Sequence, residues 1–136
     1  PAATDEAFAG DWLATGDHGR ADHDGLIYVV GRAKDMIDYS GENVYPAEVE
    51  NILGEHPAVA EVAVIGLPHA RTGEEVVGVI VLHGASDTDA AEAALAELCE
   101  TNLARFKRPS RYFFVDQLPR TPAGKVQKHR LQEEFS

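Results

Sequence analysis

The sequence of 136 residues contains a single cysteine, Cys99, so an intramolecular disulfide is excluded. One cysteine suits a reducing compartment, and we expect a cytoplasmic protein. No apolar run approaches the roughly 20 residues that a membrane-spanning helix needs, and no charged-then-apolar leader opens the chain. We therefore predict no transmembrane segment. The chain begins at Pro1 rather than at methionine, so we expect it to be part of a longer protein.

Basic residues are scarce: 12 lysines and arginines face 23 aspartates and glutamates, for a formal net charge of -11. The shortage is uneven, because residues 105–136 contain eight of the basic residues and only three of the acidic ones. That segment carries +5 and residues 1–104 carry -16. The acidic body argues against nucleic acid as a partner, since duplex binding depends on phosphate neutralisation. The basic segment is typical of a site for a small phosphorylated ligand, or of a solvated basic face.

The remaining composition, 44% hydrophobic and 26% charged, is typical of one folded globular domain. Residues 1–12 are rich in alanine and aspartate and are predicted to be loop. Asp24-Gly25 precedes the apolar run 26–30, which predicts a β-hairpin. Pro46 is expected to begin a helix, at a position where its missing N–H costs nothing. Strands are predicted at 61–66 and 76–82, the second apolar enough to be central in its sheet.

A longer helix is predicted from about 88 to 103, with an inward face of Ala91, Leu95, Leu98 and Cys99. On that face Cys99 is typical of core packing rather than of a nucleophile. Residues 112–115 predict another strand, and a short helix is expected from about Lys128. The predicted fold class is therefore α+β, with a small mixed sheet flanked by helices and preceded by the β-hairpin.

Two polar segments follow one another along the first third of the chain. In residues 15–17 the carboxylate of Asp17 stands beside a glycine, which suits binding of two ribose hydroxyls and equally suits a turn. Arg32 could bind a ribose or phosphate with its planar fork, or form a surface ion pair with Asp35 or Asp38. Gly41 lies in a turn cluster, where it lets a ligand approach the backbone or simply turns the chain.

A third segment, residues 118–128, places Lys125 directly after a glycine in a loop stiffened by prolines. A compact positive charge there can stabilise the negative charge that builds between an attacking carboxylate and a departing pyrophosphate. The glycine spacing of a phosphate-cradling P-loop is absent. Taken alone, the segment is also typical of a solvated surface loop.

Together the three segments resemble the C-terminal region of the adenylate-forming enzymes, which include acyl-CoA synthetases, peptide-synthetase adenylation domains and beetle-type luciferases. The matches are TGD at 15–17, GRAKD at 31–35 and PRTPAGK at 119–125, in the family's order and spacing. The resemblance implies an ATP-dependent acyl-CoA synthetase that forms acyl-AMP and pyrophosphate, then a thioester with CoA. It also implies that residues 1–33 are the tail of a large N-terminal domain, and that 34–136 form a mobile C-terminal lid.

Residue by residue, the resemblance implies that Lys125 is the catalytic lysine, which orients the carboxylate and the α-phosphate during adenylation. It implies that Asp17 and Arg32 bind the ATP ribose. Lys34 would be the hinge about which the lid rotates, and Gly41 would line the pantetheine tunnel in the thioester-forming state. No metal ligand is predicted in this chain.

The resemblance implies ATP, Mg²⁺ and CoA as cofactors of the full-length enzyme, with none tightly bound to this chain, which alone should be inactive. The implied partners are its own N-terminal domain, a carboxylic acid, ATP and CoA. SGENVYPAEVE at 40–50 resembles synthetases for fatty or aryl acids. Asp38 stands where some relatives carry a lysine, so we assign it no role. Two alternatives stay open: a peptide-synthetase-type lid that serves a carrier protein, and a non-enzymatic α+β binding module.

Overall fold

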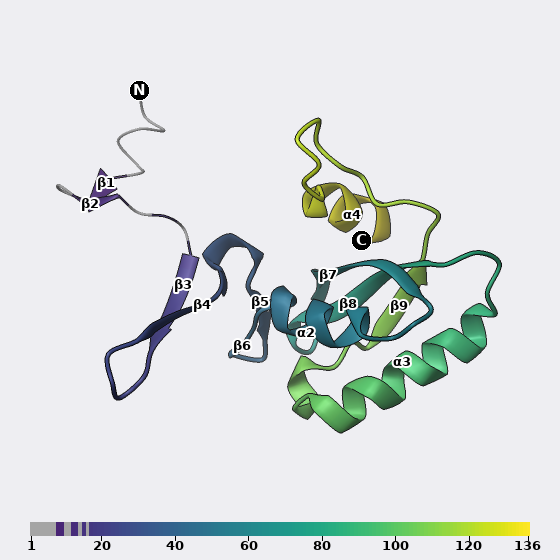
Figure 1. The fold of residues 1–136 in the computed structure, drawn as a ribbon, viewed down its shortest axis with the longest axis horizontal. Coiled ribbons are helices and arrows are strands. Elements are labelled where there is room, and N and C mark those ends of the chain that lie inside the picture. The colour runs from purple at the N-terminus through teal and green to yellow at the C-terminus, as the bar shows by residue number, and fades with distance from the viewer. Residues whose placement is uncertain (1–7, 10–11, 14, 16) are drawn as a thin grey trace.

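The computed structural model describes residues 8–9, 12–13, 15 and 17–136 (Figure 1). Its strands are β1 (Phe8–Ala9), β2 (Trp12–Leu13), β3 (Asp17–Ala21), β4 (Ile27–Arg32), β5 (Ile37–Tyr39), β6 (Glu42–Val44), β7 (Val59–His69), β8 (Gly73–Leu82) and β9 (Arg111–Phe114). Its helices are α2 (Pro46–Gly54), α3 (Thr88–Asn102) and α4 (Lys128–Phe135), with 3₁₀ turns η1 (Ala33–Asp35) and η2 (Arg105–Lys107).

Two small antiparallel pairs precede the main sheet (Figure 1). β1 pairs with β2, so the prediction of loop was wrong for these residues of the opening stretch. β3 pairs with β4 around a turn in which the Asp22 carboxylate accepts hydrogen bonds from the N–H groups of Asp24 and Leu26. Aspartate commonly stabilises a turn in this way. The predicted hairpin is therefore confirmed.

The main sheet has five strands, in the order β6-β5-β8-β7 with β9 added beside β8. β8 pairs with β5 and β7 in antiparallel fashion and with β9 in parallel, so it is central, as predicted. The α+β class with a small mixed sheet is confirmed. The β5–β6 hairpin was not predicted, because two three-residue strands are too short to show alternation of apolar and polar residues.

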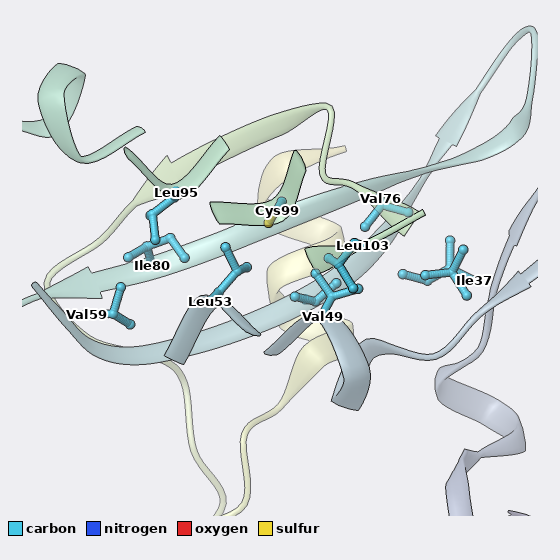
Figure 2. Packing of buried hydrophobic residues seen from close by; sticks show 11 residues of the cluster. Ile37, Val49, Leu53, Val59, Val76, Ile80, Leu95, Cys99 and Leu103 are labelled. Atoms are coloured by element: carbon cyan, nitrogen blue, oxygen red, sulfur yellow. The ribbon is translucent and has the colours of Figure 1, made fainter. Parts of the chain in front are cut away.

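Strand β8 is buried on both faces, which explains its nearly continuous apolar sequence. Val76 and Ile80 pack on one face against α2 and α3, as Figure 2 shows with Leu53 and Leu95. The intervening valines point to the opposite face and pack with Leu131 of α4. The sheet therefore lies between two layers of helix, with a hydrophobic core on each side.

Helix α3 is capped by Asp87. The Asp87 carboxylate accepts hydrogen bonds from the N–H groups of Asp89 (3.0 Å) and Ala90 (3.2 Å), two donors that the first turn leaves without a helical partner. Of its predicted inward face, Leu98 is only half-buried and the other three residues are buried. Burial raises the pKa of the Cys99 thiol, which packs in the core as predicted (Figure 2).

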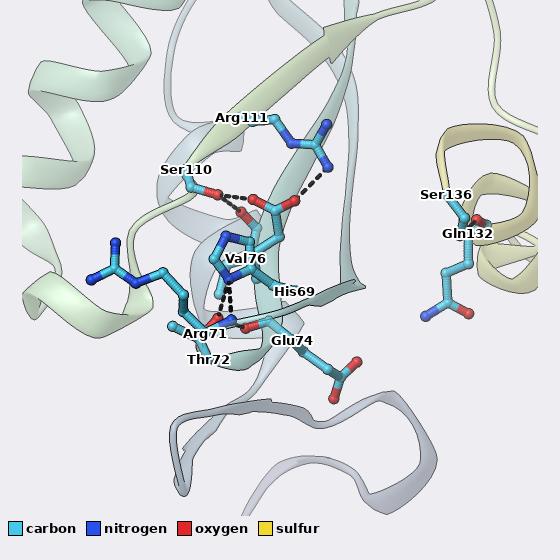
Figure 3. A network of polar contacts seen from close by, with 10 residues as sticks. His69, Arg71, Thr72, Glu74, Val76, Ser110, Arg111, Gln132 and Ser136 are labelled. Atoms are coloured by element: carbon cyan, nitrogen blue, oxygen red, sulfur yellow. Dashed lines mark hydrogen bonds and ion pairs between the residues drawn. The ribbon is translucent and has the colours of Figure 1, made fainter.

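A buried carboxylate joins β8 to the start of β9. Glu75 is 8% exposed, and it accepts hydrogen bonds from the Ser110 hydroxyl (2.6 Å) and the Arg111 guanidinium. Figure 3 shows these groups converging, with His69 nearby. Burial by itself raises the pKa of Glu75, but the hydrogen bonds from Ser110 and Arg111 and the positive charges of Arg111 and His69 outweigh it, so the pKa is lowered.

The core between the sheet and α2 predicts a large effect for Leu53, which is 0% exposed. Leu53→Ala should lower the free energy of unfolding by about 2–5 kcal/mol, because it removes buried methyl groups and leaves a cavity. Leu26→Ala is the matched control: Leu26 is 59% exposed, and its truncation should change stability by less than about 0.5 kcal/mol. Urea unfolding of both variants measures the difference, and similar losses would contradict the assigned core.

The lowered pKa of Glu75 predicts a pH-dependent contribution to stability. Its charged form is favoured in the folded state, so the stabilisation is fully present above the ordinary carboxyl pKa and is lost as pH falls through the lower folded-state pKa. At pH 7, Glu75→Gln should destabilise by about 1.5–3 kcal/mol, the range for hydrogen bonds to a charged group. The gap between wild type and variant should narrow as unfolding is measured at more acidic pH; a constant gap would contradict the prediction.

Candidate functional site

A β-bulge sets the position of the first two predicted residues. The register of β3 and β4 shifts between His18 and Gly19, and beyond the shift Asp17 lies opposite Arg32. Without this extra residue, Asp17 would lie opposite Gly31. The Asp17 carboxylate is 3.3 Å from Arg32 Nε, and both side chains are partly exposed. Arg32 therefore forms its ion pair with Asp17, and not with Asp35 or Asp38 as the sequence suggested.

The predicted hinge residue lies in a very short connection. Lys34 is exposed in the 3₁₀ turn η1, which joins β4 of the hairpin directly to β5 of the main sheet. At the end of this turn, Met36 N donates to Ala33 O over 3.4 Å, a long and therefore weak hydrogen bond. A connection this short can change its backbone torsions without disturbing either sheet.

Gly41 forms the tip of the β5–β6 hairpin. Ser40 and Gly41 have φ angles of 51° and 88°, and Tyr39 pairs with Glu42 across them. Positive φ at both central positions is the geometry of a tight hairpin turn, and glycine adopts it without strain. The Asp38 carboxylate accepts a hydrogen bond from Gly41 N (2.8 Å). The exposed glycine tip is thus fixed in shape, and Asp38 has a structural part in it.

The Lys125 loop is closed by backbone hydrogen bonds. Thr121 N donates to Lys125 O (2.8 Å), and Gly124 N donates to Thr121 O (2.8 Å), with Gly124 at φ 87°. The Arg120 guanidinium also donates to Gly124 O (2.7 Å) and pairs with Glu61 of β7. Lys125 is exposed at the end of this loop, three residues before α4 begins. Its backbone is therefore anchored while its ammonium group is accessible.

An open pocket of about 530 Å³ brings three of the predicted residues together. Arg32, Lys34 and Lys125 all line it, with Lys128 adding a further ammonium group. The remaining lining residues are Asp35, Val64, Ile65, Gly66, Thr121, Val126, Gln127, His129 and Gln132. Four cationic side chains beside one carboxylate make a lining suited to a phosphorylated ligand.

The other two predicted residues do not line this pocket. Asp17 is ion-paired with Arg32, which does line the pocket. Gly41 lies elsewhere, beside the turn between β7 and β8, where Ser40 N donates to Thr72 O (2.8 Å). Lys125 and Gly41 thus lie on two different parts of the surface of the described chain.

Sequence reasoning missed the ion pair that secures the base of the Lys125 loop. Glu50 of α2 accepts hydrogen bonds from Lys128 Nζ (2.6 Å) and from Val64 N (3.1 Å) of β7. One carboxylate therefore joins α2, β7 and the start of α4. Glu50 and Lys128 are far apart in the sequence, so no local pattern indicates that they meet.

Within the part of the chain that the structure describes, no group of three or more His, Cys, Asp and Glu side chains gathers as a metal site would require. Nor does any helix there combine the length and apolar character needed to cross a bilayer.

A family model described as the AMP-binding enzyme C-terminal domain matches residues 48–125, more than half of the chain. The chain belongs to this family. The resemblance inferred from the three sequence segments is therefore confirmed. The matched residues include Lys125 and the whole of α2, β7, β8, α3 and β9 except the first two residues of α2.

Three relatives show how far this C-terminal domain extends. A long-chain-fatty-acid–CoA ligase of Mycobacterium tuberculosis is 44% identical over 136 residues, which are 100% of this chain and 26% of that protein. A fatty acid–acyl-carrier-protein ligase of Streptomyces coeruleorubidus is 42% identical over 99% of this chain and 26% of its own. The solved o-succinylbenzoate CoA synthetase of Bacillus subtilis, in complex with its acyl-adenylate intermediate, superposes with a TM-score of 0.85 at 38% identity, covering 94% of this chain and 26% of that one. The chain thus spans about a quarter of the length of these relatives.

The half-buried Glu50–Lys128 pair of this AMP-binding C-terminal domain predicts measurable coupling. In a double-mutant cycle, Glu50→Ala and Lys128→Met should couple by about 1 kcal/mol or more, because each side chain has little access to water once its partner is gone. The control is the Glu48–Lys107 pair, also on α2, in which Glu48 is 46% exposed. Its coupling should be about 0–1 kcal/mol. Urea unfolding of both cycles gives the two values, and equal coupling would contradict the role given to Glu50.

Proposed function

We propose that this chain is the C-terminal lid of an AMP-forming acyl-CoA ligase, which activates a carboxylic acid with ATP and transfers the acyl group to CoA. The observation that carries the proposal is the shared pocket of Arg32, Lys34 and Lys125, within a domain of the AMP-binding family. Of the relatives described above, one is named a CoA ligase and one a CoA synthetase, which supports CoA as acceptor. The carrier-protein ligase among them makes the acceptor a point to be tested.

In the first half-reaction, the carboxylate of the acid attacks the α-phosphate of ATP and pyrophosphate leaves. Lys125 places its ammonium group against the carboxylate and the α-phosphate, where negative charge increases in the transition state. Asp17 accepts hydrogen bonds from the ribose hydroxyls, and Arg32 donates to the ribose from the opposite strand. The ion pair between Asp17 and Arg32, at 3.3 Å, supports this division because it keeps an acceptor and a donor side by side.

In the second half-reaction the lid rotates about Lys34, withdraws Lys125 and presents the Gly41 turn to the pantetheine arm of CoA. The separate locations of Lys125 and Gly41 support this scheme, because one orientation of the lid cannot direct both at the same substrate. Under this proposal residues 1–33 belong to the large N-terminal domain and 34–136 to the rotating lid. The short η1 connection supports a boundary there.

Several features of the full-length enzyme belong to the same proposal. We assign no residue of this chain to Mg²⁺, since no described cluster suits it, and the ion would enter with ATP. The phosphate and acyl pockets would lie in the N-terminal domain, so this chain alone binds no cofactor tightly. We propose a cytoplasmic location, in keeping with the free thiol of Cys99.

The proposed role of Lys125 predicts a selective defect in the full-length protein. Lys125→Ala should reduce acyl-adenylate formation by at least about 100-fold, because it removes a charge that acts only in that transition state. Thioester formation from supplied acyl-adenylate should stay within a few-fold of wild type. Acid-dependent pyrophosphate exchange and the supplied-adenylate reaction, with CoA or a carrier protein as acceptor, measure the two steps. The 136-residue chain is the negative control; exchange by it alone would contradict the proposal.

The proposed hinge predicts the opposite pattern. Lys34→Pro fixes one backbone torsion of η1 and should impair thioester formation while leaving acyl-adenylate formation largely intact. The matched control is Lys34→Ala, which removes the ammonium group and retains the backbone freedom. The same two half-reactions are measured. Equal damage to both steps by Lys34→Pro would show that Lys34 is not the pivot.

A further inference from the structure

The hairpin before Lys34 and the helix after it are joined by one aromatic side chain. His18 of β3 and Tyr45, the residue before α2, form a hydrogen bond of 2.6 Å between Nδ1 and the phenol oxygen. Their rings meet edge to face, with centroids 5.6 Å apart and an interplanar angle of 80°. Since Lys34 lies between the two segments in the chain, this contact spans the proposed pivot.

A glycine makes room for the tyrosine ring. A Cβ built on Gly31 of β4 would lie 2.7 Å from Tyr45 Cδ1 and 3.3 Å from its Cβ, closer than side-chain atoms normally approach. Gly31 is the cross-strand partner of His18. The Tyr45 ring therefore packs against His18 and against Gly31, which lies opposite His18 and has no side chain. We refer to the packing of Tyr45 on His18 and Gly31 as the Tyr45 contact.

The β-bulge places this contact and the Asp17–Arg32 pair on adjacent rungs of the same hairpin. His18 pairs with Gly31, and Asp17 pairs with Arg32. Neighbouring residues of a strand point to opposite faces, so the two pairs are directed to opposite sides. The hairpin thus carries the proposed ribose-binding pair on one side and the Tyr45 contact on the other.

The Tyr45 contact is present together with the assembled pocket. In the same arrangement, Arg32, Lys34 and Lys125 line one pocket, as the proposed adenylation step requires. Rotation about Lys34 moves α2, and Tyr45 with it, relative to the hairpin. A hydrogen bond of 2.6 Å and a ring packed directly on glycine do not survive a large rotation.

We propose that Tyr45, with His18 and Gly31, is a positioning device that holds the lid in the adenylate-forming orientation and is released when the lid turns to the thioester-forming one. The inference rests on the proposed function, since it names residues that bias the two orientations of that enzyme. None of the three touches a reacting group. They act by changing the fraction of molecules in which the lid has the adenylate-forming orientation, with Lys125 in place.

Tyr45→Phe is the sharpest variant, because it keeps the ring and removes only the hydroxyl. The loss of one hydrogen bond should shift the balance of orientations by a few-fold to about tenfold. Tyr39→Phe is the matched control: Tyr39 also lies after the pivot, but it packs against the core between the sheet and α2. Gly31→Ala should act in the same direction as Tyr45→Phe, through the collision of its Cβ with the ring.

The first measurement is hydrogen exchange of the full-length protein, followed by mass spectrometry of peptides that cover residues 17–21 and 42–46. Tyr45→Phe should increase exchange in both segments, because the hairpin and the start of α2 separate more often. Tyr39→Phe should leave these segments unchanged relative to wild type. Unaltered exchange in Tyr45→Phe overturns the proposal, whatever the protein's activity.

The second measurement compares the two half-reactions of the same protein. Tyr45→Phe should lower acyl-adenylate formation by a few-fold to about tenfold and should maintain or raise thioester formation from supplied acyl-adenylate. His18→Ala should act alike, and the double variant should add nothing further. Equal losses in both steps overturn the inference. A wild-type protein that forms no acyl-adenylate with any acid overturns the proposed function instead, and the exchange result still decides whether Tyr45 restrains the lid.

Discussion

The burial of strand β8 on both faces is the constraint on which the rest of the structure depends. Its alternate side chains enter two separate cores, one with α2 and α3 and one with α4. The Lys125 loop and the Gly41 turn are attached at different places to this platform, the main sheet with the helices packed on both of its faces. The Lys125 loop leads into α4 on one face, while the Gly41 turn belongs to the hairpin that pairs with the start of β8. A platform packed in this way can rotate as a unit and carry both segments without internal rearrangement.

The positive charge that lines the pocket is unfavourable for the start of helix α4. Helix α4 starts with Lys128, followed by two further basic or ionisable residues, and has no acidic residue in its first turn. Positive charge at a helix N-terminus is unfavourable, because the helix dipole is positive there. Glu50 neutralises Lys128, but Arg32, Lys34 and Lys125 add more positive charge to the same pocket. Unfavourable local charge of this kind is typical of functional sites, where a bound anion supplies the missing negative charge.

Much of the fold follows from local sequence patterns, and much of the site does not. The cap at Asp87, the proline that begins α2 and the continuous apolar sequence of β8 are local signals, and the structure agrees with each. The β5–β6 hairpin gives too short a signal. Glu50 meets Lys128, and His18 meets Tyr45, only because the folded sheet brings them together. The roles of Asp17, Arg32, Lys34, Gly41 and Lys125 came from the order of motifs, and they stay predictions.

The β-bulge shows why a site of this kind escapes prediction from sequence. It adds one residue to β4, and nothing in the apolar run of that strand indicates where. That residue nevertheless determines both sides of the hairpin, since it sets Asp17 opposite Arg32 and His18 opposite Gly31. A change in register would break the ion pair on one side and the site of the Tyr45 ring on the other. Nucleotide binding and lid orientation, as proposed here, would therefore depend on the same backbone irregularity. Under this proposal the backbone of the hairpin couples nucleotide binding to lid orientation directly, without an intervening chain of side chains.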